Sequence, residues 1–174
     1  MMKKTAGILS GMLVLSLLNA PDGWASSLQA APEIVNVSES SDPLLSRKAS
    51  HEKEIADLIN AEREKQSLPA FTVTPSLSGL AGIRAEEASL YFSHTRPNGT
   101  SCFTVLSENG VDYQRAGENL ALGQGTPEEA VKDWMNSDPH RKNILSQDFE
   151  EIGISCYHIN ESNYWVLIFV KQQL

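Results

Sequence analysis

The sequence lacks the positive charge that binding to nucleic acid requires. Its 174 residues include 14 Lys and Arg against 22 Asp and Glu, a formal net charge of −8. No cluster of Lys and Arg forms a stripe that would follow a phosphate backbone. Hydrophobic residues make up 41% and charged residues 21%, close to globular averages, which excludes wholesale disorder and a polytopic membrane protein. The composition therefore predicts one soluble, acidic domain.

The sequence also lacks an apolar run long enough to cross a membrane. The run from Ala6 to Leu18 follows two lysines and is shorter than the roughly 20 residues that a span needs. A polar, turn-forming stretch follows it, which is typical of a secretory signal peptide. Small residues favour cleavage before Ser26 over a cut after Ala30, so we expect a signal peptide over 1–25 and a secreted protein. An uncleaved N-terminal anchor is the alternative.

Only two cysteines occur, Cys102 and Cys156. Neither lies near the cleavage region, so a lipid anchor has no attachment point. Secretion into an oxidising compartment permits a bridge between them, and closing so long a loop is worth about 4 kcal/mol in the chain-entropy model. We expect a Cys102–Cys156 disulfide that joins a helix to a strand. Two separately buried thiols are the alternative.

Hydrophobic spacing divides the mature chain into a leader and one domain. Residues 26–49 are rich in Ser, Ala, Pro and Asp and predict a flexible leader, and 50–174 form the domain. Apolar residues at helical spacing, with capping residues and prolines at helix starts, predict four helices. These cover Ser50–Gln66, Pro75–Ala88, Ser101–Asn109 and Pro127–Met135.

The C-terminal part changes to the pattern of strands. Residues 152–159 and 164–171 are rich in β-branched and aromatic residues and are separated by a polar hairpin connection at 160–163. The unbroken apolar run from Tyr164 to Val170 requires cover on both faces of its strand. We therefore predict an α/β fold, a three-layer α/β/α sandwich with a small central antiparallel sheet.

Three polar residues stand out as candidate functional groups. His94 precedes a Pro- and Gly-containing turn, and His140 follows a Pro just after the fourth predicted helix, so both lie at element ends, where binding groups are often displayed. Glu118 lies in a segment that is otherwise small and apolar. On spacing alone, capping and surface hydrogen bonds explain these residues as well as a shared site does.

Several motifs occur in a fixed order along the chain. They are Tyr91-Phe92-Ser93-His94, Arg96-Pro97-Asn98-Gly99, Gly117-Glu118-Asn119-Leu120-Ala121, Trp134-Met135-Asn136-Ser137 running into His140-Arg141-Lys142-Asn143-Ile144-Leu145, and Ile152-Gly153-Ile154 before Tyr164-Trp165. In this combination the sequence resembles the bacterial branch of the CAP superfamily, which comprises cysteine-rich secretory proteins, antigen 5 and plant pathogenesis-related-one proteins. The resemblance runs from about Glu52 to Val170 and implies an α/β/α sandwich.

The resemblance also implies a central cleft with two His and two Glu residues that can bind a divalent cation. His94, Glu118 and His140 correspond to three of them. Ser137 stands where many eukaryotic members carry Glu. His94 and His140, with or without Glu118, match an open zinc site, and the missing acid predicts weak binding of zinc or another divalent cation. A solvated polar cleft without a metal is the alternative.

The leading functional hypothesis is a secreted, non-catalytic module that binds an extracellular ligand of cell-wall, lipid or protein origin, either free or associated with the cell envelope. Fold alone does not assign an activity. One alternative is a metal-dependent hydrolase, peptidase-like, using His94, His140 and Glu118. A further alternative is a carrier of sterol or fatty acid. No catalytic residue is assigned.

Overall fold

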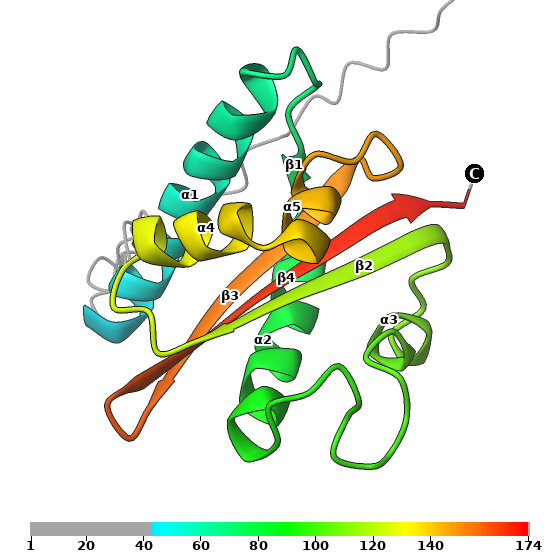
Figure 1. The fold of residues 1–174 in the computed structure, drawn as a ribbon. Helices are drawn as coiled ribbons and strands as arrows, with labels where there is room; N and C mark the ends of the chain where they lie inside the picture. Colours follow the sequence, from blue (N-terminus) through cyan, green and yellow to red (C-terminus); the bar gives the residue numbers. More distant parts are fainter. Residues whose placement is uncertain (1–42, 174) are drawn as a thin grey trace, which may run out of the picture. The chain divides into compact units, whose positions relative to one another are not determined.

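A four-stranded sheet forms the centre of the domain (Figure 1). The computed structural model describes residues 43–173, so the predicted signal peptide and most of the predicted leader lie outside the described residues. The strands are β1 (Thr72–Val73), β2 (Tyr113–Leu122), β3 (Glu151–Ile159) and β4 (Ser162–Gln172), in the spatial order β1-β3-β4-β2. The β3–β4 and β4–β2 pairs are antiparallel as predicted, but β1 pairs with β3 in parallel, so the sheet is mixed.

Helices cover both faces of this sheet. They are α1 (Pro43–Glu64), α2 (Pro75–Leu90), α3 (Thr104–Glu108), α4 (Pro127–Asn136) and α5 (Asp138–Ile144). One hydrophobic cluster joins α1, α4 and α5 to the sheet, and a second joins α2 and α3 to the opposite face. The architecture is therefore the predicted three-layer α/β/α sandwich. No helix in the described part of the chain is both long enough and apolar enough to cross a membrane.

The apolar run in β4 is explained by its central position. Alternate side chains of a strand point to opposite faces. Trp165, Leu167 and Phe169 pack with the α1 side, whereas Val166 and Ile168 pack with the α2 side. Because β4 has β3 and β2 on its two edges and helices over both faces, every one of these positions excludes water.

The first helix begins earlier than predicted. We expected it to begin at Ser50, but α1 begins at Pro43, so the last part of the predicted 26–49 leader is helical. Most described side chains between Pro43 and Ser50 are exposed. None of the side chains described there is buried, and the sequence of this part lacks the hydrophobic spacing that predicts a helix.

Two backbone features hold the sheet in place against its neighbours. The β3–β4 hairpin turns at Asn160 and Glu161, which have φ values of 49° and 60° and form the tight two-residue turn typical of twisted hairpins. At Gly153 in β3, an added Cβ would lie 2.2 Å from both the carbonyl carbon and the carbonyl oxygen of Leu77. The backbone of α2 thus lies directly on β3 at this point.

Candidate functional site

The candidate site is organised around Glu118, a carboxylate on β2 whose side chain is only 2% exposed. The guanidinium of Arg84, from α2, is fully buried and donates from Nε to Glu118 Oε2 at 2.8 Å and from Nη2 to Oε1 at 3.3 Å. Burial alone would lower the pKa of Arg84, but the hydrogen bonds and charges of Glu118 and Glu87 raise it overall. A buried carboxylate requires such a partner, so Arg84 fixes the position of Glu118.

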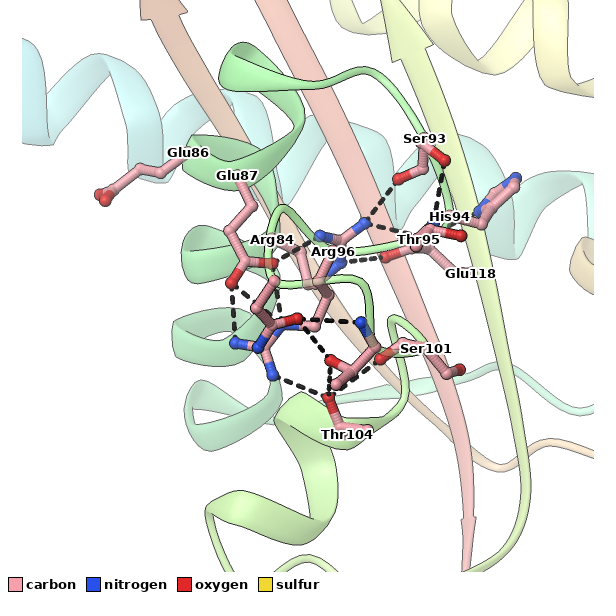
Figure 2. Close-up of polar contacts among 12 residues, drawn as sticks. Arg84, Glu86, Glu87, Ser93, His94, Thr95, Arg96, Ser101, Thr104 and Glu118 are labelled. Carbon is pink, nitrogen blue, oxygen red and sulfur yellow. Dashed lines mark hydrogen bonds and ion pairs between the residues drawn. The ribbon is translucent and has the colours of Figure 1, made fainter.

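His94 lies directly against this buried pair. Its Nδ1 is 2.8 Å from Glu118 Oε1, while the imidazole side chain remains 57% exposed (Figure 2). Arg84 also donates to the carbonyl of Ser93 at 2.9 Å, so one guanidinium positions both the carboxylate and the backbone before the histidine. With Nδ1 donating to Glu118, the Nε2 lone pair is left free to bind a ligand.

The loop that carries His94 is held down by a second arginine. Arg96 donates to both carboxylate oxygens of Glu87, to Glu108 at 2.7 Å and to the hydroxyl of Thr104 at 2.8 Å (Figure 2). These ion pairs raise the pKa of Arg96. Burial acts to raise the pKa of Glu87, but its hydrogen bonds to the two arginines lower it overall. The loop is thereby tied to α2 and α3.

His140 lies on α5, which packs on the α1 side of the sheet, and it is not among the residues that line the cleft at Glu118. The amide of Asn119 donates to its backbone carbonyl at 3.1 Å. Burial, and then the charge of His94, lower the pKa of His140. Ser137 lies between α4 and α5, and within residues 43–173 it makes no hydrogen bond to His94 or Glu118.

Cys102 also belongs to this site, although we predicted it only as one half of a disulfide. Its sulfur, a ring nitrogen of His94 and a carboxylate oxygen of Glu118 all lie within 4.8 Å of one another. Burial, and then the negative charge of Glu118, raise the pKa of the Cys102 thiol to about 12. A cleft of about 360 Å³ opens here and is lined by His94, Ser101, Cys102, Phe103, Ala116, Gly117, Glu118 and Asn143.

Comparison with known sequences identifies the family. Residues 56–169 match the family described as CAP, the cysteine-rich secretory protein family. The chain belongs to this family. It is 37% identical over 153 residues to the uncharacterized protein YkwD of Bacillus subtilis (strain 168), covering 87% of this chain and 58% of that one. It is 32% identical over 123 residues to the uncharacterized membrane protein YlbC of the same organism, covering 70% of this chain and 34% of YlbC. The chain thus spans about half or less of the length of these relatives.

Several solved structures share the fold. An extracellular protein containing an SCP domain from Bacillus anthracis str. Ames is 26% identical with a TM-score of 0.68, covering 78% of this chain and 45% of that one. An outer surface protein of Borrelia burgdorferi is 21% identical with a TM-score of 0.66, covering 71% and 94%. NaASP2, solved with Zn²⁺, is 13% identical with a TM-score of 0.52, covering 69% and 78%. The predicted CAP fold is confirmed, and the last two likenesses concern the fold alone.

The donors in this CAP cleft fit a borderline metal ion such as zinc. His94 offers an imidazole nitrogen and Cys102 offers a sulfur, which are ligand atoms that zinc prefers, whereas His140 does not belong to this group of donors. Glu118 is already paired with Arg84, so its charge is largely neutralised. With Ser137 in place of a second acid, the site offers a dication little negative charge. Metal binding by these residues stays a prediction.

The structure does not show the predicted Cys102–Cys156 disulfide. Both cysteines are free in it. Cys102 lies beside Glu118, which pairs with α2, whereas Cys156 packs against the hydrophobic cluster formed with α1 and α4. The sheet lies between the two thiols, and a bridge requires Cα atoms within about 7 Å of each other. The sequence could not show on which face each cysteine lies.

We expect both thiols to resist alkylation in the folded protein. Burial is the main cause that raises the pKa of Cys156, as of Cys102, to about 12, so neither thiolate forms appreciably at neutral pH. Iodoacetamide at pH 7.5, followed by intact-mass measurement, should leave native protein unmodified. The same treatment in urea without reductant should modify both cysteines. A denatured protein that takes up no label would show that a disulfide is present.

Proposed function

We propose that this protein is an extracellular binding module whose CAP cleft holds a divalent cation, zinc, through His94 and His140. The observation that supports this most is the hydrogen bond between His94 Nδ1 and Glu118. A carboxylate behind a histidine fixes the tautomer and ring orientation that a metal ligand requires. The N-terminal signal pattern and the extracellular or outer-surface relatives support the proposed location.

The residues around the cleft have different roles in this proposal. Glu118 orients His94 and does not itself bind the ion, because Arg84 already occupies its oxygens. The sulfur of Cys102 is a further donor, within 4.8 Å of a ring nitrogen of His94. A bound zinc ion would supply Lewis acidity in the cleft. We propose a binding role over hydrolysis, because the structure offers this one oriented histidine and no fixed partner for His140 side-chain nitrogens among the described hydrogen bonds.

Zinc titration by calorimetry tests the proposal. His94→Ala and His140→Ala should each weaken zinc binding by at least about tenfold, and Ser137→Glu should tighten it, because it restores a negative charge. Cys102→Ser shows whether the thiol contributes. His158→Ala is the matched control, because His158 is exposed on the β3–β4 hairpin and should leave the affinity unchanged. Wild-type affinity in both cleft histidine variants would contradict the proposal.

The pH dependence has a defined sign. Imidazole binds a metal only when neutral, so zinc affinity should fall as the pH drops through the histidine range near 6.5. The pKa of His140 is lowered, so this residue stays neutral to a lower pH than an ordinary histidine. The wild type has two imidazoles to protonate and His140→Ala has one, so the loss of affinity should be steeper in the wild type, and the share due to His140 should come at the lower pH. Titrations between pH 5 and 8 measure it.

A further inference from the structure

One edge of the sheet opens into the cleft. β2 pairs with β4 on one side, and no strand of residues 43–173 pairs with its other side (Figure 1). Ala116, Gly117 and Glu118 of this strand line the cleft. His94 stands on the α2 side of the strand, and Asn143, from α5, stands on the other side. The outer edge of β2 therefore runs along the cleft between two walls.

Hydrogen bonds show which backbone groups of β2 face outward. The ring N–H of Trp134 donates to the carbonyl of Leu120 at 3.1 Å, and the amide of Asn143 approaches the carbonyl of Glu118 at 3.5 Å. Both carbonyls thus point away from β4. Since backbone direction repeats every second residue, Ala116 also faces outward. Its partner in register, Val170, accepts from Glu150 on the far side of β4, as this alternation requires.

The part of this edge that lines the cleft is short, and of its three residues Ala116 is half-buried whereas Gly117 and Glu118 are buried. Trp134 covers the carbonyl of Leu120, so the edge is closed at that end. Toward the other end, the register shifts between Tyr113 and Arg115. Among the described residues, no group bonds to the N–H of Ala116 or Glu118 from outside the ladder. Exposed edges pair readily with another extended chain, and a short, walled edge admits one segment rather than a whole sheet.

We propose that the cleft binds an extended peptide segment, which pairs with Ala116–Glu118 of β2 as an added strand. This deepens the proposed binding function and rests on it, because it names the class of ligand. Alternating backbone donors and acceptors match a polypeptide and neither a sugar nor an acyl chain. Successive peptide side chains would meet His94 and Phe103 on one wall and Asn143 on the other.

A scanned peptide provides the test. Fluorescein-labelled octapeptides from a positional-scanning library are titrated against the full protein, and the best binder is resynthesised with single backbone N-methyl groups. Methylation should weaken binding about tenfold at no more than two residues, spaced two apart, and leave the residue between them unaffected, because only the peptide N–H groups opposite Ala116 and Glu118 face the strand. Loss at every position, loss at none, or no octapeptide binding at millimolar concentration would overturn the proposal.

A variant pair tests the strand itself. Ala116→Pro removes an outward-facing N–H. An edge strand tolerates proline at such a position, so the variant should fold and bind the peptide about tenfold more weakly. Ala116→Ser keeps the N–H and is the matched control. Urea unfolding checks that both variants fold. If Ala116→Pro does not fold, the N-methyl scan by itself tests the proposal. Wild-type binding by folded Ala116→Pro, or a dimer that requires this edge, would overturn the proposal.

The two proposals fail separately. The peptide titrations are run with zinc and again after treatment with a chelator. If metal-free protein binds the peptide with the expected N-methyl pattern, the added strand is supported even if zinc titration finds no site. Zinc affinity that depends on His94 and His140, without any peptide binding, supports the metal site and overturns the added strand.

Discussion

Gly153→Ala should lower the free energy of unfolding by about 3 kcal/mol or more. The new Cβ would lie 2.2 Å from backbone atoms of Leu77, and a helix backbone cannot turn aside as a side chain does. Overpacking a core with one methyl group typically costs about 1–3 kcal/mol, and here α2 must move away from β3 as a unit. Urea unfolding followed by the fluorescence of the buried Trp134 and Trp165 measures the change.

Gly79→Ala is the matched control for this result. Gly79 also lies on α2, but an added Cβ would have no neighbour within 4 Å. Replacing glycine by alanine inside a helix stabilises it by about 1 kcal/mol, so this variant should unfold at a higher urea concentration. Similar effects from both substitutions would contradict the close packing of α2 on β3.

Arg84→Met should cost about 3–5 kcal/mol of stability. The substitution leaves the buried Glu118 carboxylate without its cation and the Ser93 carbonyl without a donor. Removing one partner of a buried ion pair has an effect of this size because the other charge stays desolvated. Urea unfolding measures it, and Arg115→Met is the control, since Arg115 is exposed on β2 and should change stability by no more than about 0.5 kcal/mol.

A double variant separates the ion pair from the packing of the arginine side chain. Arg84→Met combined with Glu118→Gln removes both charges, so it should recover part of the loss. If the double variant loses as much as the sum of the two single variants, the stabilising contribution comes from packing and not from the pair.

The sequence contains a signal for this ion pair. Arg84 lies seven residues after Leu77 and four before Ala88, so it falls on the apolar stripe that predicts the buried face of α2. A charged residue on such a stripe requires a buried partner of opposite sign. Its partner is more than thirty residues away on β2, which local spacing cannot reveal.

Local chemistry predicted α2, α4 and the β3–β4 hairpin well. Thr126 accepts a hydrogen bond from the N–H of Glu129 with Pro127 at the first helical position, as its sequence indicates. The elements that were missed depend on distant partners. β2 places Glu118 and Asn119 on opposite faces of the sheet. Glu118 accepts a hydrogen bond from a residue of α2, and Asn119 accepts one from a residue of α5. These buried polar residues interrupt the hydrophobic pattern that predicts a strand. β1 has only two residues, too few for any periodicity.

The state of the two cysteines has a practical consequence for spectroscopy. Both thiols have pKa values raised to about 12, so a maleimide dye at neutral pH should react slowly with either. Asn98 is exposed in the loop that carries His94, and Arg96 ties this loop to two helices. A dye attached through Asn98→Cys would therefore sit at one defined position beside the cleft. The natural protein provides a background free of competing labels, against which ligand entry can be followed by fluorescence.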